Sequence, residues 1–321
     1  MDFRLDEEQQ QLQQTVRRFC AAHFPTEHVA RRDGARVDRS AWRELASLGV
    51  FGVLGSDDVG VVEGAIAFEQ LGVHLVGGPA LWTTLAARYV DGAARGDRLV
   101  GGIDEIADAE PTVVEHAAEI DALLVLRADG VYLCEGAELP RFDPLPPLDP
   151  LTPVGRCDAV PRGAKVGGAA DAAGLRVAGA VLCAATLLGV SDAALETSRR
   201  YALEREQFGV PIGSFQAVQH LLADMYVRTA LARSAVYAAA AVLDDPQIAD
   251  ALRASDAAKL LAGEAALENA RVAIQVHGGV GFTWEMLPNY LLKRAWVLEQ
   301  SFGDADAHAF SIGAAIEEAL A

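Results

Sequence analysis

Apolar residues near the N-terminus recur at the spacing of an α-helix, which predicts that a helix starts the fold. Asp6 and Gln9 have the spacing of a capping box at its start. A second helix is expected to begin with Ser40 as its N-cap and to stop at Gly49, and a third to run over residues 65–72. The apolar residues of the first helix are Leu5, Leu12, Val16, Phe19 and Cys20. A small N-terminal helical domain is therefore predicted, with its boundary at residue 98.

The pattern changes to short β-type runs between residues 99 and 168. The run DALLVLRADGVYLCEG places Val, Leu and Tyr on both sides of Asp129 and Gly130, and an Asp-Gly pair is typical of a β-hairpin turn. The stretch over residues 139–153 contains several prolines, which exclude it from a helix or a central strand. A small central β domain is therefore predicted for residues 99–170.

The rest of the chain is rich in Ala and Leu and predicts long helices. The expected helices span residues 175–204, 214–243, 248–276, 286–300 and 305–320. They would form a bundle of four or five helices in a C-terminal domain over residues 171–321. Apolar residues on more than one side of these helices predict burial against several neighbours, including a second subunit. The fold class is therefore mainly α with a small central β domain.

Composition and charge narrow the classes of partner. The 321 residues are 51% hydrophobic, which suits a globular protein with a large core. The formal net charge of −18 predicts repulsion from nucleic acid and from anionic membranes. We see no basic and apolar leader at the N-terminus and no run of about 18 apolar residues, so we expect a cytoplasmic protein.

The cysteines and histidines predict no metal site. Neither residue type falls in the spacing of a zinc or redox motif. The cysteines lie far apart in apolar surroundings and are expected to be buried free thiols. They are Cys20, Cys134, Cys157 and Cys183.

The most informative segment is RRYALEREQFGVPIGSFQAVQHLLADM, residues 199–225. Arg205 precedes a Phe-Gly turn at the end of a helix, where its guanidinium offers a planar fork of donors suited to a pyrophosphate. Phe208 and Phe215 could flank an adenine ring. A second segment, QVHGGVGFTWE, covers residues 275–285. Its glycines allow backbone to approach a bulky ligand, beside an amide side chain that can donate and accept.

Together the two segments resemble the acyl-CoA dehydrogenase family, whose members carry R-x-Q/T-F-G, then F-Q and L-A-D-M, and farther on Q-x-x-G-G-x-G. The resemblance implies an N-terminal helical domain, a reduced β-barrel and a C-terminal four-helix bundle. It also implies FAD as the cofactor, with its pyrophosphate and adenine held by these segments. The implied cofactor-binding residues are Arg205, Gln207, Phe208, Phe215, Gln216, Gln275, Val276, His277, Gly278 and Gly279.

The motifs that cover the flavin ring in this family are missing. Members present T-E-P-x-x-G-S-D and W-I-T/S-N in the β domain. Here only Ala109-Glu110-Pro111 is found, followed by Thr112-Val113-Val114, and no tryptophan lies between residues 100 and 168. The ring-binding half of the family's site is therefore not expected in this chain.

The family's catalytic base is missing as well. Its usual glutamate lies about two dozen residues beyond the Gly-Gly pair, and counting from Gly278 without a gap leads to Phe302, which has no basic site. The position used by a minority of members corresponds to Gly179. A shifted base at Glu299 or Asp304 is an alternative, although Glu299 at a helix end is expected to be a solvated residue. We assign no catalytic residue to this chain.

The missing and the retained motifs belong to different subunits of one FAD site. In the family's dimers one subunit holds the flavin ring and supplies the base, and its neighbour supplies the two segments that are retained here. The resemblance thus implies a non-catalytic subunit in an α2β2 acyl-CoA dehydrogenase with a second, more complete dehydrogenase subunit. The reaction would be α,β-dehydrogenation of an acyl-CoA thioester, with an electron-transfer flavoprotein as acceptor. Similar split pairs act on thioesters in steroid degradation.

Two other interpretations stay open at this point. The chain could be a self-sufficient homomeric acyl-CoA dehydrogenase that uses Glu299 or Asp304. It could also be a structural paralogue that has no contact with flavin.

Overall fold

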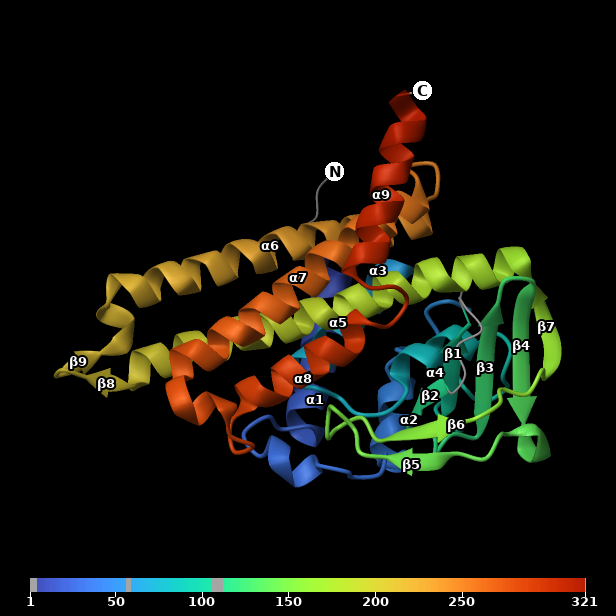
Figure 1. Cartoon of the computed structure of the whole chain (residues 1–321), viewed down its shortest axis with the longest axis horizontal. Coiled ribbons are helices and arrows are strands. Elements are labelled where there is room, and N and C mark those ends of the chain that lie inside the picture. The colour runs from blue at the N-terminus through green and yellow to red at the C-terminus, as the bar shows by residue number, and fades with distance from the viewer. Residues whose placement is uncertain (1–4, 56–58, 106–111, 321) are drawn as a thin grey trace. The chain divides into compact units, whose positions relative to one another are not determined.

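The computed structural model describes residues 5–55, 59–105 and 112–320 and is mainly helical, with small sheets in the middle of the chain (Figure 1). The expected fold class is confirmed. The α-helices are α1 Glu7–His23, α2 Arg39–Ser47, α3 Val61–Val73, α4 Ala80–Ala86, α5 Ala169–Glu204, α6 Gln216–Asp244, α7 Ala251–His277, α8 Leu287–Glu299 and α9 Ala305–Leu320. The strands are β1 Val100–Asp104, β2 Thr112–Glu115, β3 Ala122–Arg127, β4 Gly130–Glu135, β5 Asp143–Leu145, β6 Val154–Cys157, β7 Ala164–Gly168, β8 Glu206–Gln207 and β9 Val210–Pro211.

The N-terminal helices begin where local side-chain chemistry caps them. The Asp6 carboxylate accepts from the Gln9 backbone N–H, and the Gln9 side chain accepts from the Asp6 N–H, so the predicted capping box is confirmed. The predicted Ser40 cap of α2 is wrong. Asp38 is the N-cap, because its carboxylate accepts from the backbone N–H groups of Ser40 and Ala41.

The β unit consists of two small sheets, one in the order β1-β3-β4-β7 and one in the order β2-β6-β5. The predicted hairpin is confirmed as β3 and β4, and since Arg127 pairs with Gly130, the turn itself is Ala128 and Asp129. The proline-rich stretch contributes only the edge strand β5. One hydrophobic cluster takes residues from both sheets, among them Val114 of β2 and Val125 of β3. The expected reduced β-barrel thus takes the form of two sheets with a shared core.

The four cysteines are buried and free, as expected. Helix α5 is long and apolar enough to cross a membrane by length and composition alone. However, 78% of its most apolar window is buried inside the protein, which is the pattern of a core helix.

Packing divides the chain into two compact units that combine distant segments. The first unit contains residues 1–31, 65–76 and 180–321, and the second contains residues 32–64 and 77–179. Most of the long helices belong to the first unit and the sheets β1–β7 to the second. The three sequence domains with boundaries at residues 98 and 170 follow the type of element rather than packing, and they stay a prediction.

Within the first unit, α3 and α5 approach so closely that only glycine fits at the contact. A Cβ atom at Gly72 would lie 2.0 Å from the Thr186 carbonyl oxygen, and one at Gly189 would lie 2.0 Å from the Glu69 carbonyl oxygen. Backbone therefore packs on backbone at this crossing, without side chains between the helices.

Substitution of Gly189 by alanine is expected to lower the free energy of unfolding by about 1–3 kcal/mol, because the added methyl group must displace the α3 backbone. Gly174 is the matched control on the same helix, since a Cβ there has no neighbour within 4 Å. Gly174→Ala is expected to raise the free energy of unfolding by about 0.5–1 kcal/mol through helix propensity. Urea denaturation of the two variants measures both values, and equal effects would contradict the close crossing.

Candidate cofactor-binding site

The first retained segment forms a β-hairpin where α5 ends and α6 has not yet begun (Figure 1). Arg205 directly follows α5, and its backbone N–H donates to the Tyr201 carbonyl at 2.8 Å. Strands β8 and β9 then pair through a two-residue turn of Phe208 and Gly209, whose φ angles are 55° and 81°. Two successive positive φ angles match the right-handed twist of a hairpin and are uncommon for phenylalanine.

The polar side chains of this hairpin face solvent. Arg205 and Gln207 are both exposed. Within the part of the chain that the structure describes, the Arg205 guanidinium has no hydrogen-bond partner and no counter-ion. The Gln207 side chain donates to the neighbouring Glu206 carbonyl at 2.7 Å. The hairpin thus exposes a guanidinium that is available to bind an anionic group.

The two aromatic residues form an exposed corner. The Phe208 side chain is 94% exposed, and Phe215 is 39% exposed. Their ring centroids are 6.2 Å apart with an interplanar angle of 84°. An edge-to-face pair does not provide two parallel walls, and the expectation that both rings flank one adenine stays a prediction. One ring can still stack on a planar base.

The sequence analysis placed Phe215 and Gln216 in the site but missed the backbone N–H groups at the start of α6. Phe215 occupies the N-cap position and provides no side-chain hydrogen bond to the first turn, where Gln216 is exposed. Uncapped N–H groups at a helix N-terminus carry partial positive charge and suit an anionic group. A phenylalanine at an N-cap was the available signal, because this position favours Ser, Thr, Asp or Asn.

The second retained segment lies at the end of α7. Gly278 ends this helix with φ at 67°, and a Cβ at Gly278 or Gly279 would meet nothing within 4 Å. The Gln275 side chain is exposed, and its amide has no hydrogen-bond partner among the described residues, whereas its backbone carbonyl accepts from the Gly278 N–H. Val276 and His277 are instead buried, so their side chains belong to the core and only their backbone can contribute to a ligand site.

Stacking between Tyr201 and His277 brings the two segments together. The ring centroids are 4.1 Å apart with an interplanar angle of 22°. The ring of His277 is fixed further by a 2.7 Å hydrogen bond between Nδ1 and the Ala273 carbonyl. Burial lowers the pKa of His277, which favours the neutral ring at physiological pH. The ends of α5 and α7 therefore meet, with Arg205 one turn beyond Tyr201 and Gly278 next to His277.

The position expected for the base lies in the loop between α8 and α9. Phe302 is buried, and it and Gly303 have φ angles of 58° and 96°. Lys259, only 2% exposed, donates from Nζ to the Glu299 and Gly303 carbonyls, each at 2.8 Å. The Phe302 carbonyl lies 3.1 Å from Nε2 of His308. The loop is thus held by its carbonyl oxygens with a phenyl ring where a base would be needed.

The two neighbouring carboxylates, of Glu299 and Asp304, accept hydrogen bonds from backbone N–H groups. Glu299 is 8% exposed, so the expectation of a solvated residue is wrong. Its Oε1 accepts from the Ala305 N–H at 2.8 Å, which draws the carboxylate inward to the start of α9. Oδ1 of Asp304 accepts from the Ala307 N–H at 2.8 Å and caps the same helix. Gly179 lies inside α5.

The motif fragment Ala109-Glu110-Pro111 lies outside the described residues, and Thr112, Val113 and Val114 belong to β2. Among the described residues, no group of three or more His, Cys, Asp or Glu side chains could hold a metal ion.

Comparison with known families matches the sequence to two family descriptions. Residues 6–90 match "Acyl-CoA dehydrogenase, N-terminal domain" and residues 172–316 match "Acyl-CoA dehydrogenase, C-terminal domain". The second match contains both retained segments.

Individual relatives match over nearly the whole chain. The acyl-CoA dehydrogenase IpdE2 of Mycolicibacterium smegmatis is 30% identical, over 93% of this chain and 96% of the relative. The protein of the same name from Mycobacterium tuberculosis is 32% identical, over 90% of this chain and 91% of the relative. A chain in the crystal structure of the ChsE4-ChsE5 complex from M. tuberculosis is 27% identical, with a TM-score of 0.85 and coverage of 99% of both chains.

The loop at Phe302 depends on Lys259, so Lys259→Met is expected to lower the free energy of unfolding by at least about 2 kcal/mol, because two buried carbonyls lose their donor. Lys293→Met is the control. Nζ of Lys293 lies 4.8 Å from the centre of the Trp296 ring, and losing this contact is expected to cost about 1 kcal/mol or less. Chemical denaturation compares the variants, and similar small losses in both would contradict the proposed role of Lys259.

Proposed function

Because the chain belongs to the acyl-CoA dehydrogenase family, we propose that it is the base-lacking subunit of a heteromeric, FAD-dependent acyl-CoA dehydrogenase. FAD is the cofactor of this family, as expected from the resemblance. The chain contributes the adenine and pyrophosphate half of the FAD site, and a partner subunit carries the flavin-ring loops and the catalytic glutamate. When bound, FAD would supply an acceptor for the β-hydride of the thioester, while the partner's glutamate would remove the α-proton.

The proposal rests on the contrast between the segments expected to bind FAD and the loop where the catalytic base is expected. At the hairpin, the Arg205 guanidinium has no partner in the described part of the chain, and neither does the Gln275 side-chain amide near the end of α7. Together with the uncapped start of α6, they form a donor set that fits a pyrophosphate. At the base position, Phe302 is buried and Glu299 and Asp304 accept from backbone N–H groups.

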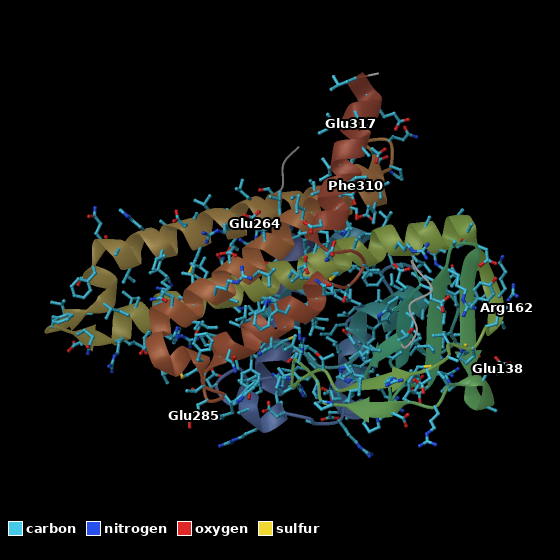
Figure 2. The ribbon with its side chains drawn as sticks, in the orientation of Figure 1. Glu138, Arg162, Glu264, Glu285, Phe310 and Glu317 are labelled. Carbon is cyan, nitrogen blue, oxygen red and sulfur yellow. The ribbon has the colours of Figure 1, made fainter. Side chains whose placement is uncertain are left out.

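Exposed apolar side chains on the first unit support a partner subunit. Phe310 of α9 is 80% exposed (Figure 2), and Tyr226 and Leu231 of α6 are exposed as well. Large apolar side chains that are exposed to solvent favour burial against another chain. The solved ChsE4-ChsE5 structure is a complex of ChsE4 with ChsE5, which supports a heteromer here. We propose an α2β2 assembly.

Substrate and acceptor follow from the family. We propose an acyl-CoA thioester with a bulky acyl group of the steroid side-chain type, and an electron-transfer flavoprotein as the acceptor. Neither nucleic acid nor a membrane surface is proposed as a partner, because the net charge of −18 opposes both. We propose a cytoplasmic location.

The two rival functions predict different contacts. A homomeric enzyme with a shifted base needs a carboxylate that can face a substrate, and the backbone hydrogen bonds of Glu299 and Asp304 oppose this. A flavin-free paralogue has no need of an uncommitted arginine beside a 94% exposed phenylalanine. The exposed phenylalanine, whose φ is 55°, carries a cost for the isolated chain that a bound nucleotide offsets.

Arg205→Ala in the purified heteromer is expected to weaken FAD binding about 10- to 150-fold, because a charge-assisted hydrogen bond worth about 1.5–3 kcal/mol is lost. Arg199→Ala is the matched control, since Arg199 is exposed six residues earlier and pairs with Glu196 instead. Flavin absorbance after gel filtration at decreasing FAD concentration measures the difference. If Arg205→Ala retained flavin as well as Arg199→Ala did, the flavin-free rival would be favoured.

Composition of the complex tests the division between subunits. Co-expression with neighbouring dehydrogenase-like genes is expected to yield a complex with one FAD per pair of different chains. The isolated chain, supplied with FAD, is expected not to oxidise acyl-CoA thioesters. Flavin quantification per chain and an assay with an artificial electron acceptor check both points. Turnover by the isolated chain would overturn the proposal in favour of the homomeric enzyme.

A further inference from the structure

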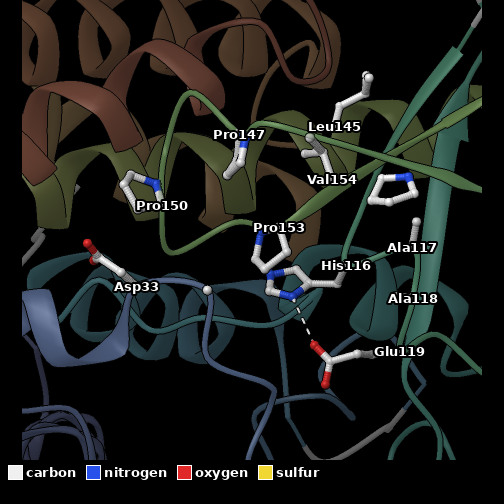
Figure 3. Close-up of a pocket in the computed structure, with 12 residues that line it drawn as sticks. Asp33, His116, Ala117, Ala118, Glu119, Leu145, Pro147, Pro150, Pro153 and Val154 are labelled. Carbon is white, nitrogen blue, oxygen red and sulfur yellow. Dashed lines mark ion pairs between the residues drawn. The ribbon is translucent and has the colours of Figure 1, made fainter.

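The second unit contains a pocket of about 440 Å³ that the proposed FAD site does not use. Its polar corner is formed by His116 and Glu119, on the turn that follows β2 (Figure 3). A second carboxylate, that of Asp33, also lines the pocket. Its apolar wall comes from the proline-rich stretch and from β6. The residues of this wall are Pro144, Leu145, Pro147, Pro150, Pro153 and Val154.

His116 has a buried ring nitrogen, Nδ1, that makes no hydrogen bond among the described residues. The residue is 3% exposed, and its Nε2 accepts from the Gly78 backbone N–H at 3.0 Å. Because Nε2 accepts, the proton of the neutral ring is assigned to Nδ1. Nδ1 is buried and makes no hydrogen bond within the described residues. A buried N–H without a partner is unfavourable, which is a reason to expect a bound group here.

Glu119 offers the matching acceptor. Its Oε2 accepts from the Val37 N–H at 3.0 Å, whereas Oε1 lies 3.8 Å from Nδ1 of His116, too far for a hydrogen bond (Figure 3). Interaction with His116 lowers the pKa of the Glu119 carboxyl, so the group is ionised at neutral pH.

The corner and the wall are held in place before any ligand binds. His116 has φ at 52°, and its N–H donates to the Pro153 carbonyl, while the Glu119 N–H donates to the His116 carbonyl. Strand pairing fixes Leu145 against Val154. Pro150 accepts from the Gly34 N–H at 2.9 Å. A rigid, preformed pocket loses little entropy when it binds a ligand.

We infer that this pocket binds a small neutral alcohol or phenol with an apolar body. The hydroxyl group accepts from Nδ1 of His116 and donates to Oε1 of Glu119, and the apolar body lies against the prolines. A carboxylate ligand would be repelled by Glu119, and an ammonium ligand would leave the Nδ1 proton without an acceptor. A water molecule would satisfy both groups but would leave the apolar wall hydrated.

Binding of 4-methylphenol to the full chain, alone or in its heteromer, tests the inference by saturation-transfer NMR and titration calorimetry. Saturable binding is expected, with 4-methylanisole and 4-methylbenzoate at least about ten-fold weaker, because the ether cannot donate and the anion is repelled. Equal binding of the phenol and its methyl ether, or no binding of the phenol at millimolar concentration, would overturn the inference and leave water as the occupant.

Two variants connect the binding to this pocket. Glu119→Gln is expected to weaken 4-methylphenol binding about ten-fold or more, whereas Glu138→Gln, an exposed carboxylate outside the pocket, leaves it unchanged. Ala118→Phe places a ring at an exposed lining position and is expected to abolish binding. Melting temperatures verify folding of each variant. Retained binding in both pocket variants would place the ligand elsewhere, and since the assay needs no flavin, its outcome is independent of the proposed FAD site.

Discussion

The stacking of Tyr201 on His277 is the contact on which the proposed cofactor site depends. With ring centroids 4.1 Å apart, it joins the C-terminal ends of α5 and α7, two helices that carry the retained segments. Arg205 follows Tyr201 by one helical turn, and Gly278 follows His277 directly. Because both rings are fixed at helix ends, the free guanidinium and the open glycine backbone come to the same end of the first unit. Without this contact the two segments would be unrelated surface features.

The described residues around the two chemical regions differ in how well their polar groups are satisfied. At the hairpin, an arginine has no partner and a phenylalanine with positive φ is almost fully exposed. At the Phe302 loop, carbonyl oxygens pair with Lys259 and His308, and the nearby carboxylates accept from backbone N–H groups. Exposed aromatic groups and uncommitted donors indicate a surface that binds something, whereas a fully paired loop indicates structure alone. This difference supports the proposal that this chain binds the nucleotide part of FAD and that a partner subunit removes the proton.

Local patterns allowed much of the fold to be predicted from sequence. The capping box of Asp6 and Gln9 is present as expected, and the last helices begin and end within a few residues of the predicted ranges except for α5, which starts earlier at Ala169. The Ser40 cap failed because Asp38, two residues earlier, offers a carboxylate to the backbone N–H groups of Ser40 and Ala41, so the helix begins before Ser40. Contacts between distant residues were not predictable in this way. Neither the stacking of Tyr201 on His277 nor the bonds from Lys259 to the Phe302 loop follows from periodicity or spacing.

The interpretation of Glu299 illustrates where sequence reasoning about a site reaches its limit. A glutamate at the end of a helix is normally solvated, and as a free carboxylate it would have been the best candidate for a shifted base. The chain turns directly after it, however, and α9 begins with an N–H group that needs an acceptor. Glu299 satisfies the Ala305 N–H and is buried by doing so. Sequence alone left Glu299 as an alternative base. In the structure it has a structural role, and the position of α9 decides between the two.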